Sequence, residues 1–171
     1  MSSTTWPPDD AQAFWDWSCG RYARPGVAPA CLELQDAHGL QVNLLLLGCW
    51  LAACGRAVAA GHAARIAAAA GGWQAAAVRP LRETRRRLKR LAAEAPEPRR
   101  DQIEALRRQV AAAELAAERI EQLELQRLAG PCPLGSGTVH QLAWANVGAL
   151  LPLAANAPGL AGAISRLLEA H

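Results

Sequence analysis

Apolar side chains recur along most of the chain at steps of three and four residues, the spacing that places them on one face of an α-helix. The first such segment covers residues 11–23, and Arg24-Pro25-Gly26 ends it because a residue before proline avoids the α region. A second segment covers residues 27–37, and Gly39 supplies a left-handed stop. Each segment predicts one amphipathic helix.

The next predicted helix begins near Asn43 and is apolar on nearly every side through Leu51. A helix without a polar face belongs in the middle of a bundle, so we expect this one to form the core. The apolar run from Leu44 to Gly55 is about 12 residues long, and Arg56 follows it. That length is too short for a membrane span.

Two long helices are predicted in the second half of the chain. After a short helix over 62–70, one runs from 73 to about 94, and Pro80 either kinks it or marks its true start. The other covers 99–128, beyond the break at 95–98, so that 73–128 forms an αα-hairpin. The spacing predicts two inward seams, made of Ala77, Leu81, Thr84, Leu88 and Leu91, and of Ile103, Leu106, Val110, Ala113, Ala117 and Ile120.

The fold class follows from these elements. Further helices are expected over 138–151 and 158–170, and we find no alternating run long enough to predict a strand. The prediction is an all-α, single-domain bundle of seven or eight helices that contains a long antiparallel αα-hairpin. Residues 1–10 are expected to be a flexible N-terminus and 11–171 a single helical domain. A chain of 171 residues that is 51% hydrophobic can bury such a core.

The net charge and the cysteines indicate which functional classes are less expected for this chain. A net charge of +3 is mild for a dedicated nucleic-acid binder, so nucleic acid is the less favoured partner. Five cysteines, an odd number without metal-ligand spacing, favour reduced thiols in a cytoplasmic protein. We therefore expect no metal site, no cofactor and no membrane span, and an enzyme is less expected than a binding protein.

The N-terminal helix carries more aromatic side chains than one face can bury. Trp15 and Trp17 lie about 200° apart around a helix, so one of them should be near the surface. With Arg21 and Tyr22 they form a candidate ligand or partner site, because Trp, Tyr and Arg dominate binding hot spots. The alternative is that Trp15 only covers the end of the bundle.

A polar segment between two apolar helices supplies further candidates. Asp36 and His38 could orient each other as a carboxylate and an imidazole do in acid–base sites, but no nucleophile lies near them. Turn and cap chemistry explains them equally well, and Asn43 suits a helix cap. If the bundle holds a small apolar ligand, the residues expected to line a pocket among the first three helices are Trp15, Trp17, Tyr22, His38, Asn43 and Trp50. No catalytic set is predicted.

The strongest charge feature is a basic helix face on the first arm of the hairpin. It contains Arg82, Arg85, Arg86, Lys89 and Arg90. These side chains could contact phosphates, but the following helix is rich in glutamate. Pairing between the two arms is therefore the favoured interpretation.

Parts of the chain resemble an uncharacterised family of small proteobacterial proteins, a domain of unknown function. The resemblance covers about Phe14 to Leu128 and implies a helical fold in a bacterial cytoplasm, with no activity or site residue to transfer. The segments that carry it are Phe14-Trp15-Asp16-Trp17, Tyr22, Pro25-Gly26-Val27, Cys31-Leu32, Leu34-Gln35-Asp36, Gly39-Leu40, Val42-Asn43-Leu44-Leu45, Trp50-Leu51-Ala52, Arg79-Pro80-Leu81-Arg82, Glu114-Leu115 and Glu118-Arg119-Ile120-Glu121.

The sequence thus leads to three functional hypotheses. The first is a non-enzymatic helical interaction or adaptor protein of the bacterial cytoplasm that binds a protein partner or a second copy of itself. The second is a bundle that holds a small apolar ligand or cofactor near its first three helices. The third is a nucleic-acid-associated protein that uses the basic helix over 79–90.

Overall fold

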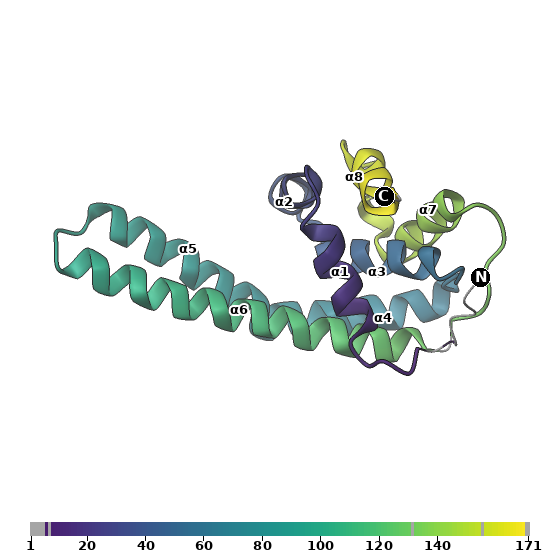
Figure 1. Ribbon diagram of the computed structural model, residues 1–171, viewed down its shortest axis with the longest axis horizontal. Helices are drawn as coiled ribbons and strands as arrows, with labels where there is room; N and C mark the ends of the chain where they lie inside the picture. The colour runs from purple at the N-terminus through teal and green to yellow at the C-terminus, as the bar shows by residue number, and fades with distance from the viewer. Residues whose placement is uncertain (1–5, 7, 131, 155, 170–171) are drawn as a thin grey trace. The chain divides into compact units, whose positions relative to one another are not determined.

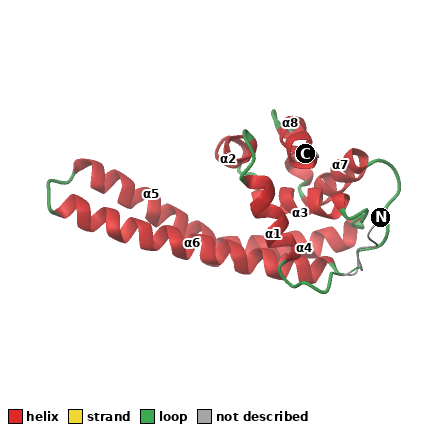
Figure 2. Cartoon of the chain, in the orientation of Figure 1, coloured by secondary structure: helices red, strands yellow, loops and turns green. Residues whose placement is uncertain are grey.

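The computed structural model describes residues 6, 8–130, 132–154 and 156–169. Within these residues the chain is helical and forms no strand, as the all-α prediction required, and Figure 2 shows helices joined by loops. One isolated antiparallel bridge joins Arg56 to Leu134. The chain divides into two compact units, residues 1–68 with 122–171, and residues 69–121, which we describe separately.

The first unit is built around one helix. Helices α1 (Ala13–Tyr22), α2 (Val27–His38), α7 (Val139–Leu150) and α8 (Leu160–Leu168) all contact α3 (Val42–Ala53). Figure 1 shows α3 among them. Every residue of α3 from Asn43 to Ala52 is buried, which confirms the predicted core helix. A short 3-10 turn, η2 (Pro152–Ala154), connects α7 to α8.

A network of buried amides holds the ends of helices together in this unit. The Asn146 side chain accepts a hydrogen bond from Val58 N at 2.9 Å and donates to the carbonyl oxygens of Arg56 and Gly48 at 2.9 and 3.3 Å. Gln126 accepts from Phe14 N at 2.7 Å and so satisfies a backbone donor in the first turn of α1. Because these amides are buried, leaving their backbone partners without hydrogen bonds would lower the stability of the fold.

The chain from Ala60 to Glu94 is one continuous helical run. It comprises α4 (Ala60–Trp73), a π-helical segment η1 (Gln74–Val78) and α5 (Arg79–Glu94), in place of the two separate helices that we predicted. Pro80 falls in the first turn of α5, directly after the π segment. Proline removes one N–H and crowds the carbonyl four residues earlier, and the wider π turn accommodates that defect without breaking the helix.

The second unit is a helical hairpin. Its arms are the end of α4 with η1 and α5, and the part of α6 (Arg99–Ala129) up to Glu121. In Figure 1 the two arms lie side by side, and hydrogen bonds join them from Trp73 Nε1 to Ala117 O at 2.9 Å and from Gln74 to Glu121 at 2.7 Å. The predicted hairpin is therefore present.

Only part of each predicted seam of the hairpin faces inward in the structure. Ile103, Val110 and Ala117 turn inward, but Leu106 and Ile120 are 48% and 52% exposed. Leu91 is likewise 52% exposed on the other arm. Several inward positions of the hairpin that we did not predict are held by polar residues of η1, α5 and α6 that pair across it: Gln74, Arg82, Arg85, Glu114 and Glu121.

The five cysteines are reduced thiols in different environments, which leads to a labelling prediction. Burial raises the pKa of Cys31 to about 11 and that of Cys49 to about 12, whereas Cys19 is exposed. Because the thiolate is the nucleophile, iodoacetamide at pH 8 should modify Cys19 and leave Cys31 and Cys49 unmodified until the protein is unfolded. Peptide mass spectrometry checks this, and modification of Cys31 at the rate of Cys19 would contradict the fold.

Candidate functional site

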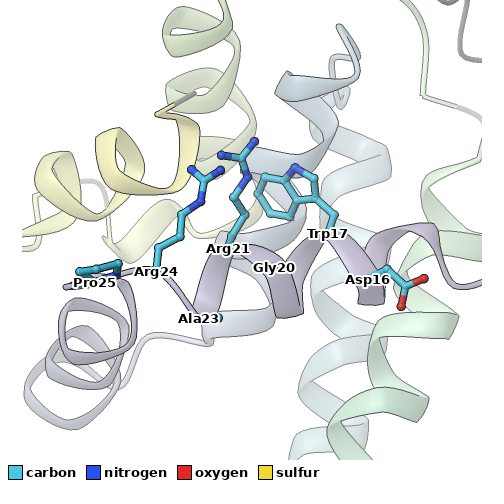
Figure 3. A pocket seen from close by; sticks show the side chains of 7 residues that line it. All are labelled: Asp16, Trp17, Gly20, Arg21, Ala23, Arg24 and Pro25. Atoms are coloured by element: carbon cyan, nitrogen blue, oxygen red, sulfur yellow. The ribbon is translucent and has the colours of Figure 1, made fainter. Parts of the chain in front are cut away.

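An open groove lies beside the C-terminal half of α1. It has a volume of about 480 Å³ and is lined by Asp16, Trp17, Gly20, Arg21, Ala23, Arg24 and Pro25. Figure 3 shows the Trp17 ring and the Arg21 and Arg24 side chains on one side of the helix, with Asp16 pointing away from them. We call this feature the aromatic–arginine groove.

Two guanidinium groups that line this groove meet at one carbonyl oxygen near the C-terminus. Arg21 Nη1 donates a hydrogen bond to Glu169 O at 2.5 Å, and Arg24 Nη1 donates to the same oxygen. The Arg21 guanidinium also lies 5.3 Å from the centre of the Trp17 ring, a cation–π distance. Partial burial, and then the charge of Arg24, lower the pKa of Arg21, although an arginine stays protonated. The arrangement suits an acceptor-rich or anionic group beside an aromatic plane.

The structure brings only some of the predicted site residues together. Trp17 and Arg21 share the groove, whereas Trp15 and Tyr22 are half-buried and do not line it. Asp36 and His38 are exposed at the end of α2.

Asn43 and Trp50 lie in the interior of the first unit. Asn43 is buried and accepts a hydrogen bond from Gln122 at 2.8 Å, and the N-cap of α3 is Gln41, so Asn43 does not cap the helix. Trp50 is 3% exposed and packs on the Phe14 ring, with 5.1 Å between ring centroids. Both side chains therefore have structural roles.

Sequence reasoning missed one aromatic residue altogether. Trp6 lies in the segment that we expected to be flexible, yet its ring is 5.3 Å from that of Trp50 and its indole N–H donates to Gly130 O at 2.9 Å. The Arg56 guanidinium lies 5.0 Å from the Trp6 ring. The one sequence feature that could have indicated this packing is the presence of a large aromatic residue in an otherwise polar N-terminus. Residues 1–5 and 7 of that predicted segment lie outside the described residues.

The basic face of the hairpin is divided between two roles. Arg82 donates to Glu114 at 2.9 Å and to Glu118 at 2.7 Å, and Arg85 donates to Glu114 at 2.5 Å. These inward pairs agree with the interpretation that the arms pair with each other. Arg86, Lys89 and Arg90 are exposed and keep the outer side of α5 strongly charged.

Glu114 makes the stability of the hairpin depend on pH. Burial raises the pKa of Glu114, but its bonds to Arg85 and Arg82 outweigh burial and hold the pKa below the usual 4.5. A carboxyl with a lowered pKa stabilises the folded state above its unfolded pKa, and this contribution disappears as the pH falls through the folded value. The stabilisation from ionised Glu114 is therefore complete above about pH 4.5 and is lost progressively as the pH falls below that value.

We expect Glu114→Gln to lower the midpoint of thermal unfolding at pH 7, and the difference from the parent protein to shrink as the pH falls below about 4.5. Circular dichroism melts between pH 3 and 7 measure both. Glu118→Gln is the control. Burial raises the pKa of Glu118, so ionisation of this carboxyl makes the folded state less stable as the pH rises, which is the opposite of the effect of Glu114. A difference for Glu114→Gln that is constant across this range would contradict the prediction.

The outward side of α6 carries an uncharged stripe. Six exposed residues repeat at steps of four and three along one face of the helix: Gln102, Leu106, Gln109, Ala113, Ala116 and Ile120. We call them the α6 stripe. The charged residues of this part of α6 lie elsewhere around the helix, and the inward Glu114 pairs with α5. A hairpin arm that is only solvated would carry charges on this face, as α5 does.

The comparisons with known proteins place the chain in a family. A family model described as a protein of unknown function (DUF2390) matches residues 13–125, which is most of the chain. The chain belongs to the DUF2390 family. The match includes α1 to α5 and the hairpin part of α6, so both the aromatic–arginine groove and the α6 stripe lie within the family's domain. No curated protein and no solved structure matched the chain.

The described residues contain neither a membrane helix nor a metal cluster. None of their helices combines the length and the hydropathy that a bilayer crossing needs. No three His, Cys, Asp or Glu side chains in this part of the chain are grouped to hold a metal ion. The two surface features above are therefore the candidate sites that the structure offers.

Proposed function

We propose that this DUF2390 protein is a non-enzymatic interaction or adaptor protein of the bacterial cytoplasm that binds another protein through the α6 stripe. The exposed, uncharged face of α6 is the observation that carries the proposal. Leu106 and Ile120 are each about half exposed on it, at 48% and 52%. An amphipathic helix whose apolar face meets water is a common element of protein recognition.

The contrast between the two arms of the hairpin supports this proposal. The outer side of α5 carries Arg79, Glu83, Arg86, Lys89 and Arg90, all exposed, which is the composition of a face that stays in water. The α6 stripe has no charged member. Binding a partner would remove the stripe from water and leave the charged face of α5 solvated.

The test is affinity capture of the tagged protein at its native expression level. The double variant Leu106→Glu/Ile120→Glu places two charges in the stripe without touching the core. Leu115→Glu is the matched control, because Leu115 is 55% exposed on the same helix but lies outside the stripe. We expect mass spectrometry to show a protein retained by the parent and the control and lost from the double variant. Identical captured sets for all three proteins, together with an oligomeric state that the double variant leaves unchanged, would refute the proposal.

A second candidate function is supported by the aromatic–arginine groove. Trp17, Arg21 and Arg24 offer a ring face and two guanidiniums, which fit a small ligand with a carboxylate or phosphate group beside an apolar part. This differs from the purely apolar ligand that the sequence suggested for the first three helices. Indole-3-acetate, which combines a ring and a carboxylate, is a suitable probe. Calorimetric binding that Arg21→Gln/Arg24→Gln abolishes would support the groove, and no heat at millimolar probe would dismiss it.

A further inference from the structure

We propose that the partner of the α6 stripe is a second copy of this chain, with the two α6 helices packed antiparallel. This inference rests on the proposed function and names the partner of the same surface. Its starting point is the arrangement of side-chain sizes along the stripe. The large residues Leu106 and Ile120 stand near its ends, and the small Ala113 and Ala116 lie between them.

The stripe is complementary to itself in one antiparallel register. That register sets Leu106 opposite Ala116 of the second copy and Gln109 opposite Ala113 of the second copy. Gln102 then faces Ile120 of the second copy, and the two-fold symmetry repeats each of these three layers. A large or long side chain meets a small one in the central layers, which is how helices interdigitate at interaxial distances of about 8–10 Å.

Charges beside the stripe favour the same orientation. Asp101 and Arg119 are exposed and lie about five helical turns apart, so they project from the same side of α6 next to opposite ends of the stripe. In the antiparallel register Asp101 of each copy comes close to Arg119 of the other. A parallel two-fold pair would place the same residue of the two copies on opposite sides of the interface, so neither Asp101 nor Arg119 would gain a partner of opposite charge there.

The contact with a second copy is compatible with the hairpin. The inward face of α6 packs on α5 through Val110, Glu114 and Ala117, whereas the stripe lies on another side of the helix. Both contacts can therefore be made at once, and the basic outer face of α5 is not needed in the interface. The interface would therefore use the uncharged stripe of α6 and leave the basic side chains of α5 outside it.

The dimer should be weak and dependent on concentration. The stripe extends over about 27 Å of helix at 1.5 Å per residue, and a single helix pair of that length is small beside the standard protein interface of about 800 Å² per partner. We expect a dissociation constant on the order of tens of micromolar. Sedimentation equilibrium of the full chain at about 5–300 µM covers this range.

The first experiment compares four proteins by sedimentation equilibrium. The parent and Leu115→Glu should dimerise equally, whereas Leu106→Glu and Ala113→Glu should each weaken dimerisation by about ten-fold or more. Circular dichroism at equal concentration shows that the variants remain folded. A parent protein that stays monomeric throughout, or a dimer that Leu106→Glu does not weaken, would overturn the inference.

A charge exchange tests the orientation. Asp101→Arg and Arg119→Asp should each weaken dimerisation by about three- to ten-fold, and the double variant should recover most of the loss. Failure of the double variant to recover would overturn the antiparallel arrangement.

The two proposals fail in different ways. If the chain is monomeric yet captures a different protein through the α6 stripe, the second copy is wrong and the adaptor function stands. If the stripe variants change neither the oligomeric state nor the captured proteins, both proposals are wrong.

Discussion

Replacing Asn146 with alanine is expected to lower the free energy of unfolding by about 3–5 kcal/mol, because three backbone groups, two of them in buried hydrogen bonds, lose their side-chain partner at once. Asn146 is 1% exposed and bonds to Val58 N and to the carbonyl oxygens of Arg56 and Gly48. A buried polar group left unpaired costs about 1–3 kcal/mol. Urea unfolding followed by circular dichroism measures the change.

The matched control for this variant is Asn156→Ala. Asn156 is exposed, so its replacement should change stability by less than about 0.5 kcal/mol. Equal losses for the two variants would show that the Asn146 network does not hold α7 to the segment that follows α3.

Much of the fold could be predicted from local signals. Pro25 and Gly26 separate α1 from α2, and Gly39 adopts the left-handed conformation that ends α2, with a φ of 63°. The density of leucine in α3 correctly predicted that this helix lies at the centre, because only the centre of a bundle buries a helix on all sides. In each of these cases the deciding residue lies in or next to the element that it determines.

In the hairpin, the spacing of apolar residues is not enough to predict which face of a helix is buried. On α6, two seams of the same spacing lie side by side: Ile103, Val110 and Ala117 face inward, while Leu106, Ala113 and Ile120 face outward. Choosing between them requires the ion pairs between the arms, because Arg82 and Glu114 take inward places that hydrophobicity alone assigns to apolar residues. The error therefore arose where polar pairing decides which face is buried.

The candidate site was predictable only in part. The excess of aromatic residues in α1 predicted that Trp15 or Trp17 would lie near the surface. Both are half-buried, and Trp17 lines the aromatic–arginine groove. The approach of Glu169 to Arg21 and Arg24 joins residues from opposite ends of the chain, which no local pattern encodes. The same holds for Trp6, whose place on Trp50 depends on tertiary packing.

The contact between α3 and α7 gives the second large expected effect. Gly48 faces Val147, and a Cβ at Gly48 would lie 2.7 Å from Val147 Cγ2, 3.1 Å from its N and 3.3 Å from its Cα. Two of these three atoms are backbone, so a rotamer change cannot relieve the overlap. Gly48→Val is therefore expected to lower the free energy of unfolding by about 3 kcal/mol.

Gly148→Ala is the matched control and should change stability in the opposite direction. Gly148 lies within α7, and a Cβ there would meet nothing within 4 Å. Alanine at an open helical position should stabilise the protein by about 0.5–1 kcal/mol. Val147→Ala removes the nearest clashing atom but leaves the backbone, so the Gly48→Ala/Val147→Ala double variant should lose less stability than the sum of its single variants, without full recovery. Strict additivity, or a tolerated valine at 48, would show that α3 and α7 do not approach this closely.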